Sequence, residues 1–69
     1  MISEMQKQML EAAAAHSAER LDNILDVAVA MGDWDTADYI ADNMFAKLSA
    51  DVQEALYRNG VVARPATVH

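Results

Sequence analysis

The residues on either side of Gly32 repeat one pattern of apolar and acidic positions, sixteen residues apart. Within each copy the apolar residues recur at i, i+3, i+4 and i+7, which is the spacing of one face of an α-helix. These positions are Leu21, Ile24, Leu25 and Ala28 in the first copy and Ala37, Ile40, Ala41 and Met44 in the second. No run of residues alternates as a half-buried strand requires. The repeat therefore predicts an antiparallel helical hairpin with its turn at Gly32.

Capping signals set the expected helix boundaries before this turn. Ser3 followed by Gln6 matches a capping box, and neither Gly nor Pro occurs from there to Met31. We therefore expect one long first helix that Gly32 ends by adopting the left-handed conformation. The alternative is a bend near His16–Ser17, where the apolar face of the helix rotates around its axis.

The remaining helices complete a small all-α fold. Asp33 can cap a second helix from about Trp34 to Lys47, and Ser49 can cap a third over residues 50–58. The expected fold is a three-helix small bundle with a long N-terminal helix and a central antiparallel helical hairpin. It forms a single domain over residues 1–62, followed by a flexible C-terminal tail at residues 63–69. A chain of 69 residues without Cys has no disulfides to stabilise it, so a well-made helical core or oligomerisation must do so.

The amino-terminal part of the first helix carries a second apolar stripe, formed by Ile2, Met5, Met9 and Ala12. One continuous helix cannot turn this stripe and the hairpin stripe toward the same small core. We therefore expect the second stripe to lack a cover within the chain and to pair with a second copy. The expected assembly is a homodimer joined through residues 1–16.

Residues 18–51 resemble a single tetratricopeptide repeat, aligned without a gap. The sequence "GDWDTA" at residues 32–37 is similar to the turn of that family, and Leu21, Ile24 and Phe45 stand at its large apolar positions. Leu25 and Ser49 depart from the pattern, because the family has a small residue and a proline there. The resemblance implies a scaffold that binds other proteins and carries no catalytic residues.

The two hairpin helices also share an acidic pattern on a separate face. Its members are Glu19, Asp22 and Asp26 in the first helix and Asp35, Asp38 and Asp42 in the second. Between Leu21 and Ala46 there are six acids and no base, so ordinary ion pairing along the helix surface is missing. A solvated face and a face that docks on a basic partner both fit this pattern. Trp34 either covers the open end of the hairpin or anchors a partner.

Residue types needed for catalysis or for metal binding are not grouped in this sequence. The acids lie away from the apolar faces, whereas acid–base catalysis needs carboxylates in a cleft. Asp33, Asp35 and Asp38 follow a glycine, but the next residues are strongly helical and do not form a calcium loop of about 12 residues. We therefore expect no enzymatic activity, no metal and no cofactor.

Charge and segment composition limit the expected partners. Eleven acidic and five basic residues give a net charge of −6, which disfavours direct contact with nucleic acid phosphates. The start of the chain, "MISEMQKQML", lacks the features of a signal peptide, and the longest apolar run is far below the ~20 residues of a membrane span. We therefore expect a cytoplasmic protein without a membrane partner.

These observations favour a non-enzymatic protein–protein interaction module. We expect a small acidic helical adaptor or inhibitor that docks on another protein with a basic surface. Its size and charge would suit an inhibitor encoded by a phage or a plasmid. The alternative is a structural or assembly subunit that acts through homo-oligomerisation. Weaker alternatives are an inhibitor that mimics the phosphates of DNA and a helix-turn-helix regulator, which the acidic helices disfavour.

Overall fold

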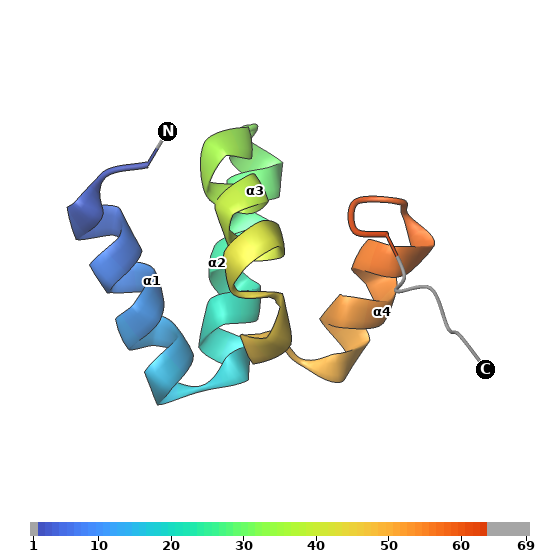
Figure 1. The fold of residues 1–69 in the computed structure, drawn as a ribbon, viewed down its shortest axis with the longest axis horizontal. Coiled ribbons are helices and arrows are strands. Elements are labelled where there is room, and N and C mark those ends of the chain that lie inside the picture. The colour runs from blue at the N-terminus through green and yellow to red at the C-terminus, as the bar shows by residue number, and fades with distance from the viewer. Residues whose placement is uncertain (1, 64–69) are drawn as a thin grey trace.

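The computed structural model describes residues 2–63, which form four α-helices and one short 3₁₀ helix. The helices are α1 (Glu4–His16), α2 (Ala18–Met31), α3 (Trp34–Asn43) and α4 (Ala50–Arg58), and η1 (Phe45–Lys47) joins α3 to α4. In Figure 1, α1 and α3 lie next to α2, α3 runs back along α2, and α4 stands apart from all three. The expected all-α class is confirmed. The expected tail, except residue 63, lies outside the described residues.

The expected long first helix is wrong, and the alternative of a bend near His16–Ser17 is confirmed, because the chain breaks at Ser17 into α1 and α2. Ser17 has an extended backbone (φ −169°, ψ 154°), its N–H donates to the carbonyl of Ala13, and its Oγ accepts the N–H of Arg20. One residue therefore ends α1 and caps α2. The bend lets α1 fold back on α2 and bury Leu10 and Ala13, and the three-helix bundle becomes an arrangement of four helices.

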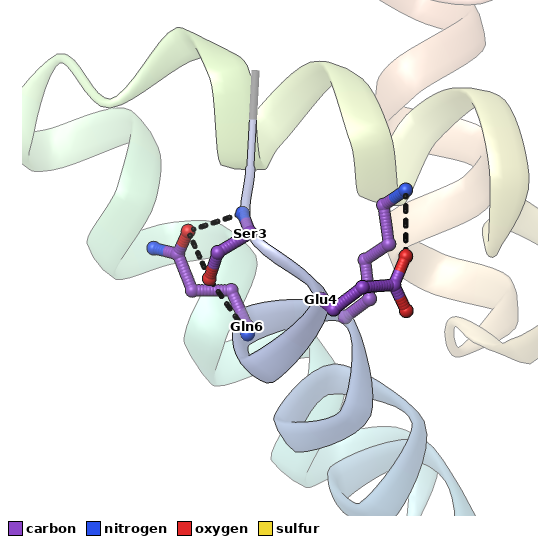
Figure 2. Close-up of polar contacts among 4 residues, drawn as sticks. Ser3, Glu4 and Gln6 are labelled. Atoms are coloured by element: carbon purple, nitrogen blue, oxygen red, sulfur yellow. Dashed lines mark hydrogen bonds and ion pairs between the residues drawn. The ribbon is translucent and has the colours of Figure 1, made fainter.

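The other helix starts follow their predicted caps. Figure 2 shows the capping box of α1, in which the N–H of Gln6 donates to Ser3 Oγ and the N–H of Ser3 donates to Gln6 Oε1. Glu4 Oε1 also lies 3.6 Å from the Nζ of Lys7, and a dashed line from Glu4 in Figure 2 marks this ion pair. At the start of α3, the carboxylate of Asp33 accepts both the N–H and the hydroxyl of Thr36. The bonds to the backbone N–H groups of Gln6 and Thr36 satisfy donors in the first helical turn that have no partner inside the helix.

Two glycines with left-handed backbones mark the ends of α2 and α4. Gly32 (φ 72°) donates to Val29 O, and the N–H of Asp33 donates to Ala28 O at 2.8 Å. This pair of bonds is a Schellman motif, and Gly60 (φ 73°) ends α4 with the same pair. A side chain at either glycine would strain the left-handed backbone.

The second helix of the sequence prediction is shorter than expected. It was expected to reach Lys47, but α3 ends at Asn43, and η1 follows after Met44 leaves the helical conformation (φ −127°). Met44 and Leu48 are both buried. Burial of these two side chains therefore stabilises the turn. A helix that continued to Lys47 would point them in other directions.

The core lies between α1, α2 and α3. Its buried cluster contains Ile2, Leu10, Leu21, Leu25, Ala28, Ala37, Ile40, Met44 and Leu48. Leu21 and Ile40 are fully covered. No residue of α4 is buried, and this helix only covers the edge of the core with half-buried side chains such as Val52 and Leu56.

Candidate protein-interaction surfaces

An apolar groove with a volume of about 560 Å³ runs between α1 and α2, and we call it the α1–α2 groove. Its apolar lining consists of Met9, Leu10, Ile24, Val27, Ala28 and Met31. Three of these side chains are well exposed, namely Met9 (64%), Val27 (56%) and Met31 (76%). Exposed apolar side chains that gather along one groove are typical of an interaction site.

The bend at Ser17 determines where this groove lies. The alanine-rich end of α1 is next to the bend, where Ala13 is buried and Ala14 packs against the core. Small side chains allow two helices to approach closely, and α1 is inclined to α2 away from that point (Figure 1). Larger side chains such as Met9 and Met31 then line the space between the helices.

The polar residues of the α1–α2 groove carry no net charge. They are Gln6, Arg20, Asn23, Asp33 and Thr36. Arg20 lies near the start of α2 and Asp33 lies just past its end, so one base and one acid occupy opposite ends of the groove. Within residues 2–63 the guanidinium of Arg20 forms no ion pair.

The structure buries one residue of the predicted self-association stripe and leaves the others exposed. Ile2 is only 8% exposed and belongs to the core, so the expectation that the whole stripe lacks a cover is wrong. The reason is the break at Ser17, which gives α1 an orientation of its own. Met5, Met9 and Ala12 are exposed, and Met9 lines the α1–α2 groove.

The α2 side of the groove was not among the predicted site residues. Ile24, Val27 and Met31 follow one another at i, i+3 and i+7, which is the spacing of a helix face. This signal is present in the sequence, but Val27 and Met31 also belong to an uninterrupted apolar run. Only the position of α1 shows that they line a groove.

A smaller cleft of about 280 Å³ separates α4 from α2 and α3, and we call it the α4 cleft. It is lined by Leu25, Val29, Trp34, Ala37, Asp38, Ala41, Leu56 and Val61. Trp34 is 59% exposed, so its ring borders the cleft without being buried by the hairpin. Its role as an anchor for a partner stays a prediction.

The six predicted acids differ in their surroundings. Glu19, Asp26, Asp35, Asp38 and Asp42 are exposed. Asp22 is half-buried, and its Oδ1 accepts the backbone N–H of Ser49 at 3.0 Å, just before α4. Asp38 lines the α4 cleft. Asp22 therefore has a structural contact that the acidic pattern does not reveal.

Within residues 2–63, no three His, Asp or Glu side chains are placed to hold a metal ion. No helix there has the length and apolar character needed to cross a bilayer. The chain matches no protein-family model, no curated protein and no solved structure. The resemblance to a tetratricopeptide repeat therefore stays a prediction.

Proposed function

We propose that this protein is a non-enzymatic interaction module, a small acidic adaptor or inhibitor that docks on a basic surface of another protein. The docking surface consists of the exposed acids of α2 and α3, and we call these five the acidic surface: Glu19, Asp26, Asp35, Asp38 and Asp42. Asp22 is left out because it holds the start of α4. The proposal includes no catalytic step.

The observation that carries the proposal is the contrast between four of these acids, Glu19, Asp26, Asp38 and Asp42, and the acids of α1. Glu4 pairs with Lys7 and Glu11 pairs with Lys47, so the α1 carboxylates have cationic partners inside the fold. Within residues 2–63, no Lys or Arg pairs with Glu19, Asp26, Asp38 or Asp42. Unpaired like charges on neighbouring helices repel each other, and a basic partner relieves that repulsion.

The surroundings of Asp38 add an apolar element to this surface. Asp38 shares the α4 cleft with the exposed side chains of Trp34, Val29 and Val61. Partner-binding surfaces commonly combine an aromatic anchor with charges at its edge. We infer that the partner places an apolar side chain in the α4 cleft and basic side chains beside it.

The test is capture of a partner from lysate with four acids of the surface neutralised. The variant carries Glu19→Gln, Asp26→Asn, Asp38→Asn and Asp42→Asn. A matched control neutralises four acids elsewhere, by Glu4→Gln, Glu11→Gln, Asp51→Asn and Glu54→Gln, so both proteins have the same net charge. Circular dichroism checks that both remain helical.

We expect a basic protein to be retained by the wild type and the control, to be released as salt is raised, and to be lost by the surface variant. Equal retention by both variants would contradict docking through the acidic surface. Equal loss from both would show that net charge alone attracts the partner.

A further inference from the structure

We propose that the α1–α2 groove binds a second copy of this chain, forming a two-fold symmetric homodimer. Each copy places Met9, Val27 and Met31 against the same side chains of the other. This interface is separate from the acidic surface and does not depend on the proposed docking function.

Charge is the first reason that the occupant is a second copy. The chain has a net charge of −6, so two copies repel each other through most of their surfaces. The α1–α2 groove contains one base, Arg20, and one acid, Asp33, and its other lining residues are uncharged. Two copies can therefore approach through this face without placing a surplus of acids in contact.

The positions of these two charges make the groove complementary to itself. A two-fold interface brings one patch against the same patch of the partner, turned end to end. With the two α2 helices antiparallel across such an interface, Arg20 of each copy faces Asp33 of the other. Both oxygens of Asp33 bond to Thr36, but a carboxylate has further lone pairs that can accept from a guanidinium.

The apolar centre of the interface lies between these two ion pairs. Val27 lies about midway along the chain between Arg20 and Asp33, so it lies close to the partner's Val27 in this arrangement. Met9 and Met31 are flexible enough to fill the space around it. The α1 and α2 helices of two copies then form a four-helix arrangement with an apolar interior, which stabilises a small domain that has no disulfide.

Two valines of α2 provide a matched test. Val27 and Val29 are 56% and 46% exposed, but Val27 lines the α1–α2 groove and Val29 lines the α4 cleft. Sedimentation equilibrium at high micromolar concentration should give two chains for the wild type and for Val29→Asp. The Val27→Asp variant should give one chain and stay helical by circular dichroism.

Three results would overturn the dimer or its placement. A wild-type mass of one chain excludes a second copy and leaves the groove to a foreign partner. A dimeric Val27→Asp variant places the interface elsewhere. A monomeric Val29→Asp variant shows that the interface is not confined to the α1–α2 groove.

Single thiols test the symmetry even if Val27→Asp does not fold. The sequence contains no Cys, so Val27→Cys and Val29→Cys each introduce one thiol into an otherwise thiol-free chain. Under mild oxidation by oxidised glutathione, we expect a disulfide-linked dimer for Val27→Cys and not for Val29→Cys. Equal cross-linking of the two variants would contradict the two-fold arrangement.

Charge reversal at Arg20 tests the antiparallel orientation. Arg20→Glu places an acid opposite Asp33 of the other copy, and we expect the dissociation constant to rise by about tenfold or more at low salt. Arg20→Lys should keep most of the affinity. An unchanged dissociation constant for Arg20→Glu would exclude the proposed pairing. Every groove variant keeps the acidic surface, so these results are independent of the lysate experiment.

Discussion

The carboxylate of Asp22 joins two parts of the molecule that are distant in sequence. It accepts the N–H of Ser49, and the hydroxyl of Ser49 in turn accepts the N–H of Val52 in α4. The position of α4 therefore depends on a side chain of α2. Asp38 is the equivalent residue in the other half of the acidic repeat, but its exposed carboxylate lies beside the α4 cleft.

We expect Asp22→Ala to lower the free energy of unfolding by about 1–2 kcal/mol, because the N–H of Ser49 loses a charged acceptor. Asp38→Ala should change it by no more than about 0.5 kcal/mol, because the residue is at the surface. Urea unfolding followed by circular dichroism measures both variants. A larger loss for Asp38→Ala than for Asp22→Ala would contradict the structural role of Asp22.

At the scale of single elements, the break between α1 and α2 has the largest consequences. Ser17 supplies the cap that starts α2, and the bend places Leu10 and Ala13 of α1 against the core. An unbroken helix would keep more backbone hydrogen bonds but would leave these side chains in water. Burial of several apolar side chains outweighs the few helical bonds lost at one residue.

We expect Ser17→Ala to cost about 1 kcal/mol of stability through loss of the cap on the N–H of Arg20. Helical content should not increase, because α1 still gains from burying Leu10 and Ala13. Ser17→Gly should cost less than the alanine change, since glycine is tolerated at this position. A more helical and more stable Ser17→Ala protein would show that the serine, and not packing, causes the break.

The helix boundaries that could be predicted from the sequence are those set by neighbouring residues. The capping box at Ser3, the left-handed Gly32 and the caps at Asp33 and Ser49 involve residues within a few positions of one another. Ser17 also has a capping side chain, but high helix propensity on both sides favoured a continuous helix in the prediction. The rotation of the apolar face near His16–Ser17 indicated the alternative of a bend. Contacts between distant segments decide between the two, and periodicity does not report those contacts.

The residues of the candidate site also divide into those that neighbouring residues predict and those that depend on contacts between distant segments. The acids were located correctly as surface positions of α2 and α3, except for Asp22, whose partner Ser49 is far along the chain. The α1–α2 groove could not be predicted, because it exists only once α1 lies against α2. Val27 and Met31 become groove residues through that packing alone.

At the scale of the whole molecule, stability depends on the core shared by α1, α2 and α3. Leu21 and Ile40 have no exposed surface, whereas Ile24 and Phe45 are half-buried at its margin. A domain of this size is only marginally stable, so single core truncations are large relative to its total free energy of unfolding.

We expect Leu21→Ala or Ile40→Ala to cost about 2–5 kcal/mol and to unfold most of the protein. Ile24→Ala and Phe45→Ala should cost less, because part of each side chain is already in contact with water. Thermal melts followed by circular dichroism rank the four variants. A greater loss for Ile24→Ala than for Leu21→Ala would contradict the assignment of the core.

The peripheral position of α4 has a consequence for the motions of the native protein. No residue of α4 is buried, and among its links to the rest of the fold are the Asp22–Ser49 hydrogen bond and the contact between the rings of Phe45 and Tyr57. Elements with little buried surface detach at a lower free energy than global unfolding requires.

Hydrogen–deuterium exchange should therefore show the amides of α4 exchanging before those of α2 and α3. Asp22→Ala should speed exchange in α4 more than in α2. Equal protection of all helices would mean that the molecule opens only as one unit. Detachment of α4 would expose the side of the α4 cleft that α2 and α3 form, while Leu21 and Ile40 stay covered. The surface beside Trp34 would therefore change shape without loss of the folded core.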